Sequence, residues 1–342
     1  MDVISLFSGA GGMDIGFEKA GFNIKVAVEL DAIAAKTYRS NNPYTKLIEG
    51  DVGEVIPELI KYKGITVLIG GPPCQGYSLA GKMALDDPRS QLIFTFCDAI
   101  EQIQPKIFVM ENVDNLAKSD KFADAREALF NRFSKMGYDF KVHLVDARRF
   151  GVAQKRSRMF IVGGKSRRPV NGHHLLEFEK PLTTVRKVIE GLGAPGSATN
   201  LYEAKARIVP VKKPVLRRTP WAGMLFNGQG RPVNLDALSG TLPASMGGNR
   251  TPIIDQRWLN DATQTPWGES YFTRIQQGEV STDIIVPDFM RRMTVTEAAR
   301  LQTFPANYVF SGSIPQMFSQ VGNAVPCDMA YAIALAIKTH ML

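Results

Sequence analysis

The sequence has little cysteine, no long apolar run and no internal repeat. Its three cysteines cannot form a disulfide framework, and no Cys/His cluster has the spacing of a zinc site. No apolar run approaches the roughly 18 residues that a membrane span needs, and the N-terminus lacks the basic-then-apolar order of a secretory signal. These absences predict a cytoplasmic protein with no metal and no membrane partner. The 342 residues, 44% of them hydrophobic, exclude general disorder and indicate two domains, or one domain with a large insertion.

Acidic residues are missing from two long stretches of a chain that carries 41 Lys and Arg against 33 Asp and Glu. Residues 147–176 include eight basic residues and residues 204–235 include seven, with no acidic residue in either stretch. Positive charge gathered in this way favours a surface that binds a polyanion. Solvated loops are the alternative, and the charge pattern alone does not decide between the two.

The first half of the chain alternates short β-branched runs with helical patterns. This alternation predicts a doubly wound, mostly parallel α/β sheet. In such sheets ligands collect at the carboxyl ends of the strands, where the informative turns of this sequence also lie. The expected strands are 3–7, 25–28, 67–69, 107–110 and 159–162.

The middle of the chain is irregular and rich in Gly, Pro and Asn. We expect residues 167–289 to form a smaller, β-rich domain inserted into a larger one made of residues 1–166 and 290–342. Thr294 and Glu297 have the spacing of a capping box, which predicts a helix over 294–304. The apolar run 328–337 predicts a buried helix that packs back on the first domain.

A glycine-rich turn, residues 7–12, follows the first expected strand. It is not a dinucleotide fingerprint, because Asp14 stands where that pattern needs glycine. Glu29 ends the second strand, where an acid suits ribose hydroxyls, and Asp51 follows the third strand region, where it suits an adenine amino group. The pattern favours an adenosine ligand without a phosphate chain over ordinary turn glycines and caps.

Cys74 follows two glycines and two prolines in the segment 70–78, at the end of a strand. Prolines stiffen the chain ahead of it, and neighbouring backbone N–H groups and arginines favour a thiolate. We therefore interpret Cys74 as a nucleophile. Cys97 and Cys327 lie in apolar helical settings and have the pattern of buried structural cysteines.

Two further polar segments accompany the expected strands. Glu111 comes directly after the strand 107–110, at the sheet edge where Cys74 is expected. Alternation along an extended segment sends Gln154, Arg156 and Arg158 to one face. A surface cap and a solvated basic stretch are the alternatives for the two segments.

Together these segments resemble the motifs of the DNA cytosine-5 methyltransferase family, in the family's order and spacing, and most closely its bacterial restriction-modification members. The resemblance covers about 1–165 and 290–342, and the central region matches only loosely, as in the family's target-recognition domains. Two departures are Cys327, where the family often has proline, and Thr296, where it often has arginine. The matching motifs are Phe7-Ser8-Gly9-Ala10-Gly11-Gly12, Pro72-Pro73-Cys74-Gln75, Glu111-Asn112-Val113, Gln154-Lys155-Arg156-Ser157-Arg158, the helix from Thr294 to Gln302, and Gln320-Val321-Gly322-Asn323-Ala324-Val325-Pro326.

The resemblance implies that the cofactor is S-adenosylmethionine, the methyl donor. It also implies that Cys74 attacks C6 of a flipped-out cytosine, that Glu111 contacts N3, that Arg158 binds O2 and that Arg156 helps to hold Glu111. The segment from Gly76 to about Arg89 would close over the flipped base. The residues implied to bind the donor are Phe7, Ser8, Gly9, Ala10, Gly11, Gly12, Glu29, Leu30, Asp51, Val52, Pro73, Leu92, Asn323 and Val325.

The partner implied by the resemblance is double-stranded DNA, bound by a monomer. Gln229 lies between two glycines upstream of the Thr241-Leu242 pair typical of the family's recognition domain, which suits a side chain that fills the gap left by the cytosine. The residues expected to contact DNA are Gln75, Ser78, Gln154, Lys212, Lys213, Gln229, Arg231, Thr241, Asn249 and Arg250.

Three other functions fit less well. An RNA methyltransferase of the same fold is weakened by the long, glycine-rich central region, which resembles a groove-reading domain. A catalytically silent paralogue would be expected to have lost Cys74, Glu111 or Arg158, and all three are present. A nicotinamide dehydrogenase fails on the glycine pattern.

Overall fold

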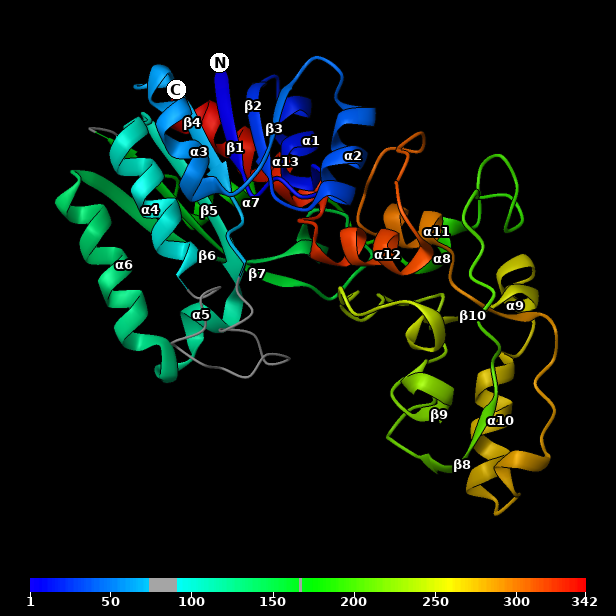
Figure 1. The fold of residues 1–342 in the computed structure, drawn as a ribbon. Coiled ribbons are helices and arrows are strands. Elements are labelled where there is room, and N and C mark those ends of the chain that lie inside the picture. The colour runs from blue at the N-terminus through cyan, green and yellow to red at the C-terminus, as the bar shows by residue number, and fades with distance from the viewer. Residues whose placement is uncertain (74–90, 166–167) are drawn as a thin grey trace.

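The computed structural model describes residues 1–73, 91–165 and 168–342. Its centre is a seven-stranded sheet with the order β3-β2-β1-β4-β5-β7-β6 (Figure 1). β7 pairs antiparallel with β5 and β6, and the other neighbours pair parallel, which confirms the doubly wound, mostly parallel sheet. The strands are β1 (Asp2–Leu6), β2 (Asn23–Glu29), β3 (Lys46–Glu49), β4 (Val67–Gly70), β5 (Ile107–Val113), β6 (Tyr138–Asp146) and β7 (Ser157–Lys165).

Helices cover both faces of this sheet because successive strand residues point to opposite sides. Val3 packs on one face, and the next residue, Ile4, packs on the other. The first face carries α1 (Gly12–Lys19), α7 (Gly172–Leu176) and α13 (Cys327–His340), and α2 (Ala32–Asn41) lies beside β2 and β3. The second face carries α3 (Val52–Leu59), α4 (Leu92–Ile103), α5 (Asp114–Lys118) and α6 (Ala123–Lys135).

The C-terminal helix α13 packs against α1, as the apolar run near the end of the sequence predicts (Figure 1). The two helices approach closely at Gly16, where an added Cβ would lie 2.6 Å from the Cβ of Ala330. The last segment of the chain therefore closes the core beside the first strand and its turn.

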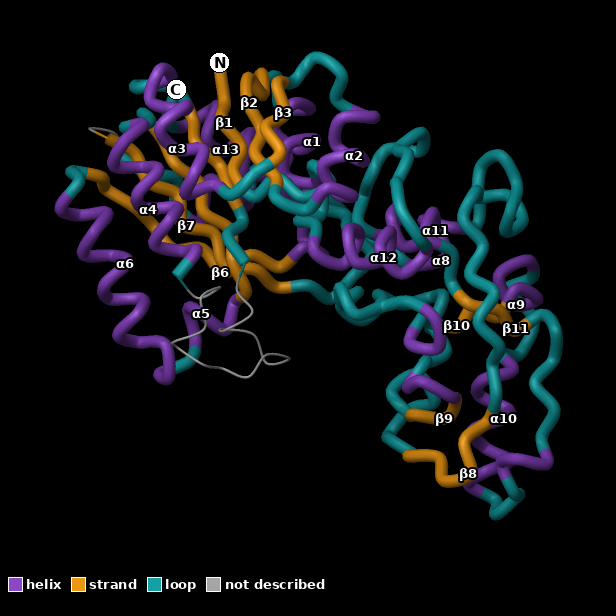
Figure 2. The backbone as a smooth tube through the Cα atoms, viewed as in Figure 1, coloured by secondary structure: helices purple, strands orange, loops and turns teal. Residues whose placement is uncertain are grey.

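Residues 205–289, here called the small lobe, extend away from the sheet and contain mostly loops and short elements (Figure 2). Their apolar residues form a core of their own around Phe226, Ile253 and Tyr271. The short elements in and beside the small lobe are α8 (Val185–Ile189), β8 (Pro210–Val215), β9 (Met224–Phe226), β10 (Ile253–Asp255), α9 (Gln256–Asn260), α10 (Trp267–Gln276) and β11 (Met290–Arg292).

A further core joins the small lobe to the rest of the molecule. It combines Leu235 and Leu242 with residues of α11 (Val295–Leu301) and α12 (Ile314–Asn323). Val170 and Leu175, which the sequence places in the inserted domain, pack instead on the sheet beside α13. The hydrophobic cores therefore combine residues from inside and outside the range 167–289. The domain division at these bounds stays a prediction.

Helix α11 begins as the sequence predicts. The Thr294 hydroxyl accepts from the Glu297 N–H at 3.0 Å, and the Glu297 carboxylate accepts from the Thr294 N–H at 2.9 Å. The helix ends at Leu301 rather than at 304, because Thr303 has a left-handed backbone with φ of 61°. This turn directs the chain toward α12.

A buried carboxylate supports the glycine-rich turn from below. Asp14, in the first turn of α1, accepts hydrogen bonds of 2.7 Å from the Ser5 hydroxyl of β1 and from the Tyr38 hydroxyl of α2. Burial raises the pKa of Asp14 from its ordinary value of 3.8 to about 6, although both hydroxyl bonds oppose the shift. Asp14 therefore ties β1, α1 and α2 together directly beneath residues 7–12.

We expect Asp14→Asn to change how stability depends on pH. The folded state binds the Asp14 proton more tightly than the unfolded state does, so its contribution to stability is lost as pH rises from 3.8 to about 6. Asparagine does not titrate, so the stability of the native protein relative to the variant should fall by on the order of 2 kcal/mol across that window. Urea unfolding of both proteins at about pH 4 and above pH 7 measures this difference. The exposed residue Glu54, changed to Gln, is the control, and a pH-independent difference would contradict the assignment.

Candidate functional site

A cavity of about 710 Å³ opens at the carboxyl ends of β1, β2, β4 and β5. Gly11 belongs to the turn but does not line the cavity. An added Cβ at Gly11 would come within 3.2 Å of the Tyr38 ring and 3.1 Å of the Tyr308 hydroxyl. The predicted donor residues that line the cavity are Phe7, Ser8, Gly9, Ala10, Gly12, Glu29, Leu30, Asp51, Val52, Pro73, Leu92, Asn323 and Val325.

The glycine-rich turn takes a backbone path that few other sequences allow. Phe7, Gly9 and Gly11 have φ values of 55°, 56° and 80°, in the left-handed region that glycine adopts most easily. An added Cβ at Gly9 would have nothing within 4 Å, so the backbone at Gly9 has open space beside it. The turn thereby lets a ligand approach the main chain between β1 and α1.

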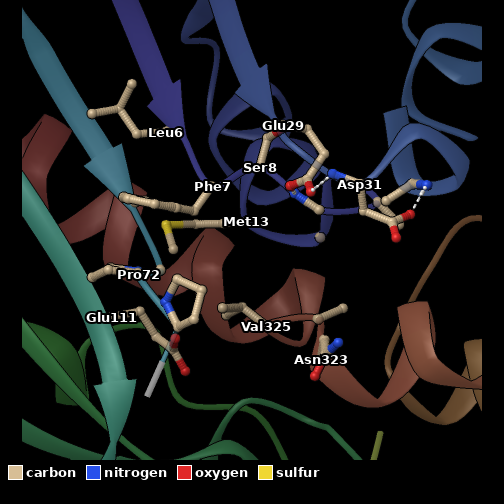
Figure 3. A pocket seen from close by; sticks show the side chains of 18 of the residues that line it. Leu6, Phe7, Ser8, Met13, Glu29, Asp31, Pro72, Glu111, Asn323 and Val325 are labelled. Carbon is tan, nitrogen blue, oxygen red and sulfur yellow. Dashed lines mark hydrogen bonds between the residues drawn. The ribbon is translucent and has the colours of Figure 1, made fainter. Parts of the chain in front are cut away.

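Glu29 is held rigidly at the end of β2. One carboxylate oxygen accepts from the Gly9 N–H at 2.7 Å and the other accepts from the Asp31 N–H at 2.7 Å (Figure 3). Burial raises the pKa of Glu29, and the two amide bonds oppose that shift. Each oxygen retains capacity for a further hydrogen bond from a hydroxyl in the cavity.

Asp51 is the N-cap of α3 and accepts from the Gly53 N–H at 2.7 Å. Its carboxylate lines the cavity together with Val52. The site thus combines two carboxylates at adjacent strand ends with the apolar side chains of Phe7 and Leu92, which suits a ligand with hydroxyl and amino groups on a flat ring system.

Glu111 and Arg158 form a second group of polar side chains at the same cavity. Arg158 Nε lies 3.1 Å from Glu111 Oε1, and the two side chains are only 16% and 13% exposed. The antiparallel pairing of β5 with β7 brings them together, because Val113 stands opposite Arg158. Burial raises the pKa of Glu111, while the charges of Arg158 and Arg156 oppose the shift.

The segment after β4 packs directly on Glu111. An added Cβ at Gly71 would lie 3.1 Å from Glu111 Oε2, and the Asn112 side-chain amide donates to the Pro72 carbonyl at 3.2 Å. Figure 3 shows Glu111 beside Pro72, apart from Glu29 and Asp31. Cys74, Gln75, Ser78 and the expected closing segment 76–89 lie outside the described residues; Pro73, the residue before Cys74, lines the cavity.

Arg156 binds backbone carbonyls in addition to its expected place near Glu111. Its fully buried guanidinium donates to the carbonyls of Leu242 at 3.3 Å, Gly322 at 3.0 Å and Ala324 at 2.9 Å. Its charge also lowers the pKa of Glu111, after the larger effect of Arg158. The structure therefore adds to the expected role a link between two backbone segments, at Leu242 and at residues 322–324.

Gln154 does not lie where a DNA contact requires it. Its side chain is fully buried: the amide donates to Gln302 Oε1 at 3.1 Å, and its oxygen accepts from the Leu242 N–H at 3.1 Å. Alternation correctly sends Gln154 and Arg156 to the same side, but that side is the interior. The expectation that Gln154 binds DNA is corrected accordingly.

The other described residues expected to contact DNA are exposed and belong to the small lobe and its edge. Gln229 lies in the short helical turn η5 (Asn227–Gln229), which contacts the turn η6 (Gly248–Arg250). Lys212 and Lys213 are exposed on β8. Exposed positions near these turns include Arg231, Thr241, Asn249 and Arg250.

The structure also places residues at the cavity that the sequence patterns miss. They include Met13, Asp31, Gln316 and Ser319. The sequence does carry a signal for the helix that holds Gln316 and Ser319, because Ser313 and Pro315 mark the start of α12. Among the described residues no cluster of three or more His, Cys, Asp or Glu side chains is suited to a metal, and none of their helices is long and apolar enough to cross a membrane.

Comparisons with known proteins identify the family. A family model for C-5 cytosine-specific DNA methylase matches residues 1–339. The chain is 32% identical over 361 residues to Type II methyltransferase M.NgoPII of Neisseria gonorrhoeae, covering 99% of this chain and 95% of that one. It is 33% identical over 349 residues to Type II methyltransferase M.FnuDI of Fusobacterium nucleatum, covering 99% and 94%.

Solved structures agree on the fold. The Dnmt2 methyltransferase of S. pombe superposes with a TM-score of 0.68 at 18% identity, covering 99% of this chain and 98% of that one. The methyltransferase EhMeth of Entamoeba histolytica superposes with a TM-score of 0.69 at 17% identity, covering 99% and 98%. With its family model matched over nearly the whole sequence, the chain belongs to the C-5 cytosine-specific DNA methylase family.

Proposed function

We propose that this DNA (cytosine-5)-methyltransferase transfers a methyl group from S-adenosylmethionine to C5 of a cytosine that is flipped out of a short, specific double-stranded DNA sequence. The observation that carries this proposal is the single cavity that joins the Glu29 and Asp51 carboxylates to the Glu111–Arg158 pair. One end of the cavity suits an adenosine and the other suits the polar edge of a pyrimidine.

The cavity fits the donor in size and chemistry. Its volume of about 710 Å³ lies within the range of sites for small molecules. Glu29 would accept from the ribose hydroxyls, Asp51 would accept from the adenine amino group, and Phe7 and the 8–12 turn would hold the base and the methionine part. When bound there, S-adenosylmethionine supplies an electrophilic methyl group.

The second half of the site addresses the low reactivity of the cytosine ring. C5 is a poor nucleophile because attack from it breaks aromaticity, and addition of the Cys74 thiolate at C6 makes C5 an enamine-like carbon. Glu111 would donate a proton or a hydrogen bond to N3, and its raised pKa favours the protonated form that this step needs. Arg158 would bind the O2 oxygen. After methylation a base removes the C5 proton and the Cys74 bond breaks.

Duplex DNA would meet the exposed basic side chains of the small lobe. Flipping a cytosine costs a few kcal/mol, because its pairing and stacking are lost. Gln229 can donate and accept through its amide, so it suits the gap opposite the unpaired guanine. Arg231, Asn249 and Arg250 would read neighbouring bases, with arginine favouring guanine.

The family relatives named as Type II methyltransferases extend the proposal to a biological role. We infer that the enzyme protects its host's DNA from a cognate restriction endonuclease. It would act as a monomer in the cytoplasm.

Expression in a methylation-free host, followed by bisulfite sequencing, tests the reaction and identifies its target. Cys74→Ser should abolish methylation while donor and DNA binding persist, because a hydroxyl is far less nucleophilic than a thiolate. DNA with 5-fluorocytosine at the target should form a covalent adduct with the native enzyme and with Cys97→Ala, whose altered residue is buried under the sheet. Methylation by Cys74→Ser, or methylation of transfer RNA in preference to duplex DNA, would contradict the proposal.

Two substitutions should separate the donor site from the base site. Glu29→Ala should weaken S-adenosylmethionine binding by about tenfold or more, because charged hydrogen bonds to the ribose are lost. Arg158→Ala should leave donor binding within about threefold and lower kcat by roughly a hundredfold, as loss of a transition-state hydrogen-bond donor does. Calorimetry and single-turnover kinetics measure the two effects. Glu49→Ala, at the exposed end of β3 beside Glu29, is the control, and the reverse ranking would show that the two halves of the site are assigned wrongly.

The affinity for DNA should fall steeply with salt, because basic side chains release counterions from the phosphates. Changing Lys212 and Lys213 together to Gln should reduce the slope of log K against log salt by about two, while the target sequence stays the same. Fluorescence anisotropy over a salt series measures the slope. The matched control changes Lys61 and Lys63, exposed on the sheet domain beside α3; an equal effect there would move the DNA surface away from β8.

A further inference from the structure

Arg292, at the end of β11, is a buried arginine whose hydrogen-bond acceptors are all neutral in the part of the chain that the structure describes. Only 2% of the residue is exposed. Its guanidinium donates to the carbonyls of Thr251 at 2.9 Å, Ala206 at 3.3 Å and Arg207 at 3.3 Å, and to the side-chain oxygen of Asn227 at 2.8 Å. Burial without a carboxylate partner lowers its pKa to about 10.

The neighbouring arginine shows the more common solution. Arg291 donates to both oxygens of the Glu297 carboxylate, which also forms the capping box of α11 with Thr294. Arg292 has the same charge and lies in the same short strand but is buried among amide and carbonyl oxygens. Burying an unpaired charge is costly. The four hydrogen bonds of Arg292 offset that cost and fix the segments that carry their acceptors.

The segments that Arg292 joins include the turn η5 and the residue that follows the turn η6. Asn227 begins η5, and its side chain also donates to the Arg207 carbonyl at 2.9 Å and accepts from the Val209 N–H at 3.1 Å. Thr251 follows η6 directly. One planar guanidinium therefore binds the loop that precedes β8, the first turn itself and the residue that follows the second turn.

Two glycines allow these turns to touch. An added Cβ at Gly230 would lie 2.1 Å from Arg292 Nη1, and one at Gly228 would lie 2.3 Å from the Cβ of Asn249. The exposed residue between them, Gln229, has a left-handed backbone with φ of 65°. A non-glycine residue in that conformation is strained and persists only where its surroundings hold it.

We propose that Arg292 is a positioning residue for base displacement, which holds the two turns as one unit and keeps Gln229 in the conformation that enters the duplex. This inference rests on the proposed function, in which Gln229 fills the gap left by the cytosine. Without Arg292 the turns would have to become ordered during DNA binding, and that ordering weakens association.

The test compares Arg292→Lys with the native enzyme and with Arg291→Lys, which alters a neighbouring arginine away from the turns. Lysine keeps the charge but is a point donor that cannot bridge several segments from one plane. Binding is measured by anisotropy and flipping by 2-aminopurine fluorescence at the target position, on an intact duplex and on one with an abasic site opposite the target. Donor binding by calorimetry reports whether each variant is folded.

For Arg292→Lys we expect donor affinity within about twofold of native and a loss of about tenfold or more in affinity and flipping on the intact duplex. On the abasic duplex, where no partner guanine needs replacement, the loss should shrink to about threefold or less. Arg291→Lys should show no such difference between the two duplexes. An equal loss on both duplexes, or no loss on either, would overturn the positioning role.

A second variant covers the case in which Arg292→Lys does not fold. Gly230→Ala places a methyl group against the guanidinium and should produce the same selective defect on the intact duplex; native behaviour of this variant would also overturn the proposal. A native enzyme that gives no 2-aminopurine signal on its target would instead refute the proposed function. If the native enzyme flips the base and both variants flip it equally well, only the inference about Arg292 fails.

Discussion

The arrangement of the two halves of this enzyme depends on how the backbone of Leu242 is held. Its N–H donates to the Gln154 side chain, and its carbonyl accepts from Arg156. The same guanidinium binds the carbonyls of Gly322 and Ala324, on either side of the cavity residue Asn323. One buried arginine thus fixes the segment at Leu242 against the rim of the cavity. A displacement of Leu242 would therefore disturb the hydrogen bonds that hold residues 322–324, and the reverse also applies.

The backbone around this junction is too close-packed to tilt freely. An added Cβ at Gly322 would lie 2.5 Å from backbone atoms of Pro243 and Ala244, so α12 contacts the main chain directly after Leu242. The Thr241 hydroxyl donates to the Lys155 carbonyl at 2.6 Å, and the Lys155 N–H donates to the Ser239 carbonyl at 2.9 Å. These two hydrogen bonds fix residues 239–244 against Lys155, and Lys155 precedes the strand that carries Arg158. They therefore set the position of residues 239–244 relative to Glu111 and Arg158. The position of the Glu111–Arg158 pair relative to residues 239–244 is therefore set by the fold itself.

Much of the sheet and of the cavity could be predicted because the relevant signals are local. Glu29 ends a strand and Asp51 follows one, and the carboxyl ends of parallel strands meet at one edge. The capping box of Thr294 and Glu297 is likewise contained in four residues. The partners of Gln154 and Arg156 could not be predicted, because Leu242 and Gly322 are distant from them in sequence. Leu242 lies in an irregular segment, and the helical pattern that includes Gly322 does not indicate which side chain its carbonyl meets. Alternation gave the correct side for Gln154 but carried no information on whether that side faces DNA or the interior.

Arg156 and Arg292 perform the same physical task, which the sequence does not indicate for either residue. In the sheet, backbone N–H and C=O groups pair with each other, so side chains are free to pack or to bind ligands. In the small lobe, the described ladders are two short pairs of strands, and many carbonyls lie in loops. Arg292 binds carbonyls of the small lobe, and Arg156 binds the Leu242 carbonyl together with two carbonyls at the end of α12. The several donors of a guanidinium lie in one plane, so they can join separate segments. An irregular region is thereby given fixed geometry without regular secondary structure.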